Sequence, residues 1–362
     1  MGGAERFTQR LAIALSQRGY EVWIAAEQWP EASNGAYRVK KIASSNTGSF
    51  SRECLDCIVR QHDGVIFSLE RTVRQHIFRA GDGVHACWLK RRGPYQSAFG
   101  RWGTLWNWKH RRVLELERQV FAPQRTDWVI AHSQMVKREI MEFFSFPEER
   151  IRVIPPGVDL KLMQPCVDPG RRSELRHGYG IPKDAVVWCF VGSGFERKGL
   201  FWAIQIAALQ TEKVWLLVLG KGKQQYFVHA AEKSGFDARL CFVAAGTSSL
   251  DVYHASDAFI LPTIYDPCAN AALEAAACGL PVITTRANGA VEWIHGVILK
   301  DPSHVAECAA ACAVHARPWT PFTDHASLRS RLDENICWDA MQQLIREVEL
   351  RAIKQIGPFQ AP

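Results

Sequence analysis

The chain has 362 residues, 47% of them hydrophobic and 22% charged, and its formal net charge is +7. This composition is typical of a globular protein with enough residues for two α/β domains, and it argues against disorder. The sequence contains no run of 18 apolar residues and no export signal at its start, so neither a membrane-spanning helix nor secretion is predicted.

The eleven cysteines are scattered, and several lie inside apolar segments, as Cys189 and Cys241 do. Cysteines at such positions behave as small hydrophobic residues, which favours a reducing cytoplasm. Cys54 and Cys57 form a single C-x-x-C pair with only His62 nearby. A structural zinc site needs a second pair of ligands at matching spacing, so we predict no metal there and interpret the pair as two cysteines on one helix face.

The first half of the chain alternates between helical and strand patterns. Residues 3–18 have the apolar spacing of a helix, with Phe7 and Leu11 on its buried face. Strand patterns follow in the segments EVWIAA, YRVKKIA, DGVIFSL, QHIFRAG, DWVIAHS and IRVIPPG. This alternation predicts a doubly wound parallel sheet. Gly2 and Gly3 precede the first helix, where glycine allows the backbone to approach a ligand closely.

One polar turn in this half carries candidate catalytic groups. The segment RAGDGVHACWLKRR places Asp82 and His85 directly after a strand. In α/β proteins the carboxyl ends of parallel strands form the ligand-binding edge. Either side chain could act as a base or as a positioning acceptor for a hydroxyl group. His85 could equally be a partly buried histidine bonded to the backbone.

The stretch from Gly83 to Leu114 contains no Asp or Glu and combines basic with aromatic residues. Such a mixture suits a membrane interface, where aromatic rings lie at headgroup depth and cations meet anionic lipid. It could also bind nucleic acid by stacking and phosphate contact, or form a solvated basic face with tryptophans in the core. We favour the membrane and assign to it Trp88, Arg91, Arg92, Trp102, Trp106, Trp108 and Arg111.

The second half of the chain begins with a strand and a glycine-containing loop, VVWCFVGSGFERKGL. Gly192 and its small neighbours would admit an anion, which Arg197 and Lys198 would neutralise. The loop is neither a P-loop nor a dinucleotide fingerprint, because G-x-x-x-x-G-K-[ST] is absent and Arg197 occupies the position of the third glycine. The sequence predicts a phosphate site of another kind.

The segment LPTIYDPCANAALEAAACGLPVITT predicts a strand, a loop, an alanine-rich helix and a second strand. Asp266 lies in the loop and Glu274 about one turn inside the helix. The amides of Ala269, Asn270, Ala271 and Ala272 at the helix start would face an anion such as a diphosphate. Carboxylates accept hydrogen bonds only, so they suit sugar hydroxyls. A sugar nucleotide has both parts, although a buried crossover helix with an acidic N-terminus fits the same pattern.

These motifs resemble the family-4 retaining glycosyltransferases. The family pattern is an acidic residue, seven others and Glu, followed by Gly-Leu-Pro-Val, and here it runs from Asp266 to Glu274 and then Gly279 to Val282. Asp266 departs from the usual Glu, keeping the charge and shortening the reach. Gly192 with Arg197 and Lys198 matches the family's Gly-x-x-x-x-Arg-Lys-Gly motif, and Gly2 and Gly3 match its Gly-Gly-x-x-Arg pattern.

The resemblance implies a GT-B fold, in which two Rossmann-like domains face a central cleft. It implies an acceptor-side domain over residues 1–160, a nucleotide-sugar domain over 161–323 and a helical segment over 324–362 that crosses back to the first. The segment Ile154–Asp159 resembles the family hinge. The strand that should precede the first helix is missing from the sequence, so we expect an N-terminal sheet with its first strand absent.

The same resemblance assigns roles to the candidate residues. Asp266 would touch the donor sugar, Glu274 the nucleotide ribose, and Arg197 and Lys198 the diphosphate. Asp82 matches an aspartate in the catalytic cleft of bacterial lipopolysaccharide-core glucosyltransferases, and His85 is a further catalytic candidate.

The implied reaction moves a hexose, with retention, from a nucleotide diphosphate sugar, with UDP preferred, to a membrane glycolipid such as lipopolysaccharide core. No cofactor, metal or nucleic acid is expected, and the expected location is the inner face of the cytoplasmic membrane. The alternatives are a non-catalytic sugar-nucleotide-binding protein and a nucleic-acid-binding protein that uses the Trp/Arg segment.

Overall fold

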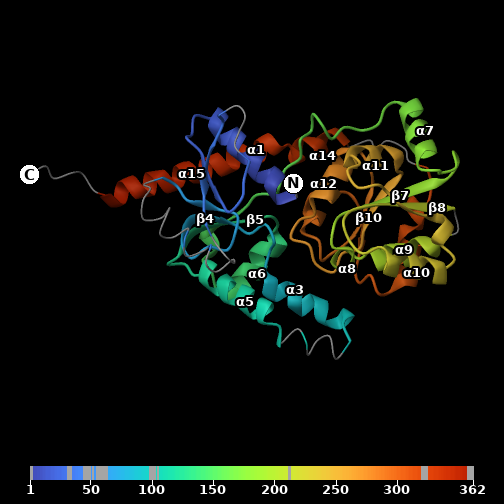
Figure 1. The fold of residues 1–362 in the computed structure, drawn as a ribbon, viewed down its shortest axis with the longest axis horizontal. Coiled ribbons are helices and arrows are strands. Elements are labelled where there is room, and N and C mark those ends of the chain that lie inside the picture. The colour runs from blue at the N-terminus through green and yellow to red at the C-terminus, as the bar shows by residue number, and fades with distance from the viewer. Residues whose placement is uncertain are drawn as a thin grey trace, which may run out of the picture.

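The computed structural model describes residues 3–30, 35–43, 50, 53, 64–97, 103, 106–210, 213–318 and 325–356. Within these ranges the strands form parallel sheets of two, four and six strands, with helices packed around them (Figure 1). Every strand of the first half of the chain overlaps a segment that the sequence predicted as a strand, and so do residues 186–191 and 282–285 of the second half. Most of these segments have the apolar run that a buried parallel strand requires, whereas Arg38–Lys41 is mainly polar and exposed.

The first half of the chain contains two of the sheets. In chain order its elements are α1 (Gly3–Gln17), β1 (Trp23–Ala26), β2 (Arg38–Lys41), β3 (Phe67–Ser68), β4 (Gln75–Arg79), α3 (His85–Arg92), η2 (Gly93–Tyr95), α5 (Trp108–Val120), β5 (Thr126–Ala131), α6 (Gln134–Phe144), η3 (Glu148–Arg150) and β6 (Ile151–Val153). Strands β3, β4, β5 and β6 pair in that order, and β1 pairs with β2. The missing first strand stays a prediction.

The four-stranded sheet is covered on both faces. Ile77 of β4 and Ile130 of β5 pack against α1 and α15, together with Phe7. Their neighbours in the same strands, Phe78 and Val129, face the opposite side of the sheet and pack against α3, α5 and α6. Successive strand residues point to opposite faces, so this alternation places one apolar layer on each side of the sheet.

The second half of the chain forms the six-stranded sheet. Its elements are α7 (Pro169–Gly178), β7 (Val186–Val191), α8 (Phe195–Lys198), α9 (Leu200–Ala208), β8 (Val214–Leu219), α10 (Gln225–Lys233), η4 (Asp237–Arg239), β9 (Leu240–Phe242), α11 (Ser249–Ala255), β10 (Ala258–Leu261), α12 (Asn270–Ala277), β11 (Val282–Thr285), η5 (Gly289–Glu292), β12 (Gly296–Leu299), α13 (Val305–Cys312) and η6 (Ala313–His315).

The order of the strands in this sheet is β12-β11-β10-β7-β8-β9. The chain therefore starts at the centre with β7, moves outward to β9, and returns to the other side of β7 with β10. This is a doubly wound sheet, and ligands bind at the carboxyl ends of the two strands where the order reverses. Those strands are β7 and β10.

The last described segment is two helices, α14 (His325–Leu332) and α15 (Glu334–Ile356). Leu328 and Leu332 of α14 belong to the core of the second domain, whereas Trp338 and its neighbours on α15 belong to the core of the first. Figure 1 shows α15 lying beside α1. Between the helices, Asp333 pairs with Val158. The crossing helix that the sequence predicted over 324–362 thus contacts the first domain from Glu334 onward.

We expect Trp338→Ala to destabilise the first domain by about 3–5 kcal/mol, because it leaves a large void in a packed core. Trp338 is buried and its ring centroid lies 5.3 Å from that of Phe7 on α1. The measurement is urea unfolding followed by tryptophan fluorescence and circular dichroism. Ile336→Ala on the same helix is the matched control, since Ile336 is 55% exposed and its loss should leave the unfolding midpoint nearly unchanged.

Candidate active site between the two domains

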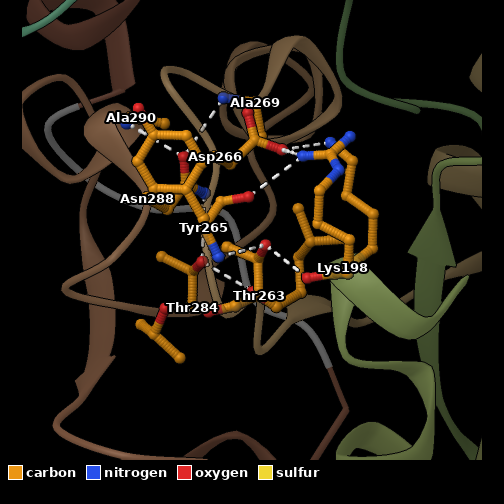
Figure 2. A network of polar contacts seen from close by, with 11 residues as sticks. Lys198, Thr263, Tyr265, Asp266, Ala269, Thr284, Asn288 and Ala290 are labelled. Carbon is orange, nitrogen blue, oxygen red and sulfur yellow. Dashed lines mark hydrogen bonds and ion pairs between the residues drawn. The ribbon is translucent and has the colours of Figure 1, made fainter. Parts of the chain in front are cut away.

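The segments that follow β7 and β10 bring the two predicted cations into contact with the predicted carboxylate. Arg197 and Lys198 lie in α8, directly after β7, and Asp266 lies in the loop that follows β10. Lys198 Nζ and Arg197 Nη1 both donate to Asp266 Oδ2, the arginine at 3.2 Å. Figure 2 shows the Lys198 and Asp266 side chains pointing toward each other. Gly192 directly follows β7 and lies beside the aliphatic part of the Lys198 side chain. The strand order, rather than sequence proximity, creates this cluster.

The charges of this cluster are strongly coupled. Asp266 is 4% exposed, and burial alone would raise its pKa. The positive charges of Lys198 and Arg197 outweigh burial and hold the pKa of Asp266 below its ordinary value. Asp266 is therefore ionised at neutral pH, and the cluster carries one more positive than negative charge. An incoming anion would meet two cations already gathered at one point.

A network of hydrogen bonds fixes the loop that carries Asp266 (Figure 2). The fully buried Asn288 accepts from the amides of Ala269 and Ala290, both at 3.1 Å, and donates to Thr284 Oγ1 at 3.0 Å. Asp266 itself donates its amide to Ala287 O at 2.9 Å. Both polar atoms of the Asn288 side-chain amide are used in these bonds, so this side chain stabilises the loop and does not bind a sugar.

This network corrects one sequence-based expectation. The amide of Ala269 is not available to a ligand, because Asn288 occupies it, and the amide of Ala272 donates to Ala269 O at 3.0 Å. The amides of Asn270 and Ala271, at the first turn of α12, have no partner among the described residues. The predicted anion-binding helix start is therefore narrower than expected and consists of these two donors.

Glu274 lies about one turn into α12, as the sequence predicted. Its Oε2 accepts from the hydroxyl of the buried Tyr253 at 2.9 Å. Burial raises the pKa of Glu274, while the positive charges of Arg6 and Arg10 on α1 act in the opposite direction. The N-terminal turns of α1, which begins at Gly3, therefore face this carboxylate across the domain boundary. Gly2 lies outside the described residues.

Asp82 and His85 lie at the carboxyl end of β4, on the side of the first domain that faces the second. The Asp82 side chain is 83% exposed, and Arg71 approaches its Oδ2 at 3.6 Å. His85 is the first residue of α3, and its Nε2 lies 3.2 Å from Nδ1 of His110. Burial, reinforced by the charges of Arg71 and His110, lowers the pKa of His85 to about 4. At neutral pH His85 is uncharged, so one of its ring nitrogens can accept a hydrogen bond.

The two domains meet directly at these loops. Tyr265, the neighbour of Asp266, accepts a hydrogen bond from Val84 N at 2.9 Å. Ser133 Oγ donates to Pro267 O at 2.8 Å. Glu292 accepts from the amides of Gln134 and Met135 at the start of α6, at 2.9 and 3.1 Å. A carboxylate at a helix start is favoured by the helix dipole, so this last contact joins the domains electrostatically as well.

Comparison with known proteins agrees with this geometry. Residues 1–162 match the family Glycosyltransferase Family 4, and residues 171–311 match Glycosyl transferases group 1. The chain is a family-4 glycosyltransferase. It adopts the GT-B fold of two Rossmann-like domains, and the predictions of family, fold and enzyme class are confirmed.

Similar proteins cover most of this glycosyltransferase. The lipopolysaccharide glucosyltransferase WaaG of Escherichia coli is 22% identical over 83% of this chain and 82% of its own length. A probable transglycosylase of Burkholderia thailandensis is 28% identical over 92% and 83%. A crystal structure of WaaG has a TM-score of 0.74 at 20% identity, covering 99% of this chain and 97% of that one. HepE of Anabaena with UDP-glucose has a TM-score of 0.69 at 18% identity, covering 96% of both chains.

Two buried glutamates of the glycosyltransferase were missed at the sequence level. Glu117 on α5 accepts from the amides of His85 and Ala86 at 2.6 and 3.2 Å and from Arg71 at 3.0 Å, so it fixes the start of α3. Glu139 on α6 accepts from Arg91 at 2.8 Å. A signal was present, because each glutamate occupies an apolar stripe of its helix, and a carboxylate at a core position must have partners.

The residues predicted to face a membrane divide into two groups. Trp106 and Trp108 are 72% and 64% exposed, and Arg111 is also exposed. By contrast, three residues of α3 are only partly exposed and contact the protein: Arg91 binds Glu139, and Arg92 lies over the ring of Trp88. Trp102 lies outside the described residues. The exposed group, which comprises Trp106 before α5 and Trp108 and Arg111 in its first turn, therefore forms the candidate surface, whereas the three residues of α3 contact the protein.

Two features are absent from the part of the chain that the structure describes. Over these ranges no helix is long and apolar enough to cross a membrane. In the same part of the chain, no group of three or more His, Cys, Asp or Glu side chains is placed to hold a metal ion. Cys54 and Cys57 lie outside it.

We expect Gly83→Ala to disrupt the domain contact of the glycosyltransferase. Gly83 has φ +67°, and a Cβ atom there would lie 2.4 Å from Tyr265 Oη and 2.7 Å from Pro267 Cγ. The methyl group would push Tyr265 out, so turnover should fall about 10-fold or more. Initial-rate measurements with the nucleotide-sugar donor check this. Gly93→Ala, where a Cβ would meet open space, is the control and should retain its activity.

Proposed function

We propose that this glycosyltransferase moves a hexose from a nucleotide diphosphate sugar to a hydroxyl acceptor, with retention of anomeric configuration. The observation that carries the proposal is the convergence of Arg197 and Lys198 on the buried Asp266 at the switch point. Two cations beside one carboxylate suit a ligand that has both a diphosphate and a sugar with hydroxyls.

Each group in the cluster has a role in this reaction. Arg197 and Lys198 would bind the diphosphate and stabilise the negative charge that develops on it as the glycosidic bond breaks. The amides of Asn270 and Ala271 would add donors at a helix start. Asp266, released from part of its ion pairing by the diphosphate, would accept from a sugar hydroxyl, and Glu274 would accept from the ribose.

We propose uracil as the base of the donor, so that the donor is a UDP-sugar. The support is the HepE structure with UDP-glucose, together with the glucosyltransferase WaaG among the relatives. We also propose that no metal ion is needed, because two cations and the start of α12 suffice in principle to neutralise the diphosphate. No cofactor other than the sugar nucleotide enters the proposal.

On the acceptor side, Asp82 and the neutral His85 would orient or deprotonate the attacking hydroxyl. Asp82 is exposed, and its carboxyl oxygens can accept a hydrogen bond from a hydroxyl group, while His85, with a pKa of about 4, is a weak base that serves better as a hydrogen-bond acceptor. Arg71 contacts Asp82, and Glu117 accepts from both Arg71 and the amide of His85, so these two residues position Asp82 and His85.

We further propose that the acceptor is a membrane-associated glycolipid, of the type of lipopolysaccharide core. Its support is the exposed start of α5, where Trp108, Lys109 and Arg111 lie on the same helix as His110, the partner of His85, and Trp106 lies two residues before that helix. Aromatic and basic residues of this kind anchor proteins at an anionic membrane surface. The protein would then act at the inner face of the cytoplasmic membrane.

A donor panel tests the reaction. The chain is incubated with UDP-, GDP- and ADP-sugars, with and without EDTA, and release of the nucleotide and the anomer of the product are measured. The expected result is turnover of a UDP-hexose that EDTA does not abolish, with a product of the same anomeric configuration. Binding of UDP without turnover of any donor would instead indicate a sugar-nucleotide-binding protein, and an inverted product would contradict retention.

Vesicle sedimentation tests the membrane surface. Vesicles containing phosphatidylglycerol should retain the protein, and pure phosphatidylcholine vesicles should retain it several-fold less. Replacing Trp106 and Trp108 by alanine should release it, whereas Tyr226→Ala, an equally exposed aromatic residue on α10, should not. Equal binding of the double variant would contradict the assignment. A shift with single-stranded RNA but not with vesicles would favour nucleic acid.

A further inference from the structure

Tyr265 belongs to one domain by sequence and to the other by packing. It lies in the loop after β10 of the second domain, next to Asp266, yet its side chain is 2% exposed inside the core of the first domain. There it packs with residues such as Val84 and Ile140. A residue adjacent to a proposed donor-binding carboxylate is thereby seated beside the acceptor-side loop.

The hydroxyl of Tyr265 is bonded on both sides. It donates to Glu139 Oε2 at 2.8 Å and accepts from Val84 N at 2.9 Å. Glu139 is itself held by Arg91, whose guanidinium carbon lies 5.6 Å from the centre of the Tyr265 ring. A hydroxyl that donates once and accepts once has a fixed orientation, and burial makes the loss of either bond expensive.

The main chain of the same residue is bonded to the donor cluster. Arg197 Nη1 donates to Tyr265 O at 3.0 Å and to Asp266 Oδ2 at 3.2 Å. Val84, bonded to the hydroxyl, stands between Asp82 and His85 in the sequence. One residue therefore joins the arginine and carboxylate of the donor side to the turn that carries both acceptor-side candidates.

The surrounding residues are shaped for this contact. Gly83, in the left-handed region, leaves the room that the phenol ring occupies. Gly289 similarly lets Pro267 O and Ser133 Oγ approach, since a Cβ there would lie 1.9 and 2.3 Å from these atoms. The close approach of the two domains thus depends on two glycines, Gly83 in the first domain and Gly289 in the second.

We propose that Tyr265 is a positioning residue, which sets Asp266 and Arg197 in register with the turn that carries Asp82 and His85. It touches no substrate and acts through the residues it holds. This inference rests on the proposed function, because it assigns those residues to donor and acceptor. Since a displacement of about 1 Å costs up to 10²-fold in rate, loss of this register should lower turnover and leave nucleotide affinity unchanged.

Tyr265→Phe is the variant that tests the proposal, because it keeps the ring and removes only the hydroxyl. UDP binding by calorimetry counts the folded sites and gives Kd, and UDP-glucose cleavage is then expressed per UDP-binding site. We expect kcat per site to fall about 10-fold, with KM and the Kd for UDP within about two-fold of the natural chain. A purely structural role would reduce the number of sites and not kcat per site, and that result would overturn the proposal.

Two matched variants complete the test. Tyr37→Phe removes a buried hydroxyl from the region of β2, where Tyr37 bonds Pro30 O at 3.4 Å, and should not change kcat. Glu139→Gln keeps an oxygen that can accept from Tyr265 and should retain more activity than Tyr265→Phe. If Glu139→Gln is the more damaging variant, the charge of Glu139 and not the tyrosine hydroxyl sets the register.

A second measurement does not depend on turnover. Hydrogen exchange with UDP bound should show fast exchange of the Val84 amide in Tyr265→Phe and slow exchange in the natural chain and in Tyr37→Phe. Unchanged protection of that amide would overturn the proposal even if no donor is cleaved. Failure of the proposed function looks different, because the natural chain would then cleave none of the donors while its Val84 amide stayed protected.

Discussion

A variant in which Arg197 and Lys198 are both replaced by methionine is expected to cleave its nucleotide-sugar donor about 10⁴-fold more slowly than the natural chain. Removing one preorganised donor of charge stabilisation typically costs 10²–10³-fold, and the two cations act on the same diphosphate, so their losses combine without being strictly multiplicative. Methionine preserves the aliphatic packing of Lys198 against Gly192. The measurement is kcat/KM for UDP-glucose cleavage.

The same variant removes the ion pairs of a carboxylate that is 4% exposed, so it should also be less stable. Adding Asp266→Asn separates the two effects. The triple variant should regain much of the lost stability in urea unfolding, because no buried charge is left unpaired, but none of the activity. Exchange of the two cations, Arg197→Lys with Lys198→Arg, should retain the UDP affinity to a large extent. Donor cleavage that survives in the methionine variant would remove the cations from the mechanism.

Asp257→Ala is expected to cause the largest loss of stability in the second domain, about 3–5 kcal/mol. Asp257 is 2% exposed and accepts from Arg172 and Arg176, each at 2.6 Å, and from the amide of Val187 in β7 at 2.7 Å. Its removal leaves the buried Arg176 guanidinium without its anion and the first strand of the sheet without one hydrogen bond.

Urea unfolding of the purified variant measures this effect. Asp251→Ala, which removes a more exposed ion pair with Arg171 on the same helix α7, is the control and should leave the unfolding midpoint unchanged. The Kd for UDP of the folded Asp257→Ala protein at low temperature should match that of the natural chain. Asp257 directly precedes β10 and bonds Val187 near the start of β7, whereas α8 follows the end of β7. Equal stability of the two variants would show that the buried pair is not needed for the fold.

Local patterns in the sequence predicted the elements and part of the site. Most strands have an apolar run, and Arg197, Lys198 and Asp266 each follow a strand, so a doubly wound sheet places them at one edge. What the sequence did not provide is the pairing across the domain boundary. Tyr265 lies in a predicted loop, and the apolar stripe around Glu139 indicates that it is buried without indicating its partner. Only the packing of one domain on the other makes the two residues partners.

The amide of Ala269 shows the same limit at shorter range. Helix rules leave the first amides of α12 free, and only the strand order reveals that Asn288, from the neighbouring loop, reaches Ala269 and occupies it. The sequence likewise grouped Arg91 and Trp88 with Trp106 by composition. The structure separates them because Arg91 and Trp88 on α3 contact other side chains of the protein, whereas Trp106, just before α5, is exposed. The composition of the segment shows which types of side chain are present, and the packing determines which of them are exposed.

The chain passes between the domains twice, and the two passages are bonded side by side. Val158 N donates to Leu332 O at 2.8 Å, and Glu334 N donates to Val158 O at 3.1 Å, while Gly157 approaches the main chain of Glu334 so closely that a Cβ would lie 2.7 Å from its Cα. Two adjacent connections define a line, and a relative motion that keeps both intact is a rotation about that line. Sliding of one domain past the other would break the bonds between the two connections, whereas a rotation about that line would keep them.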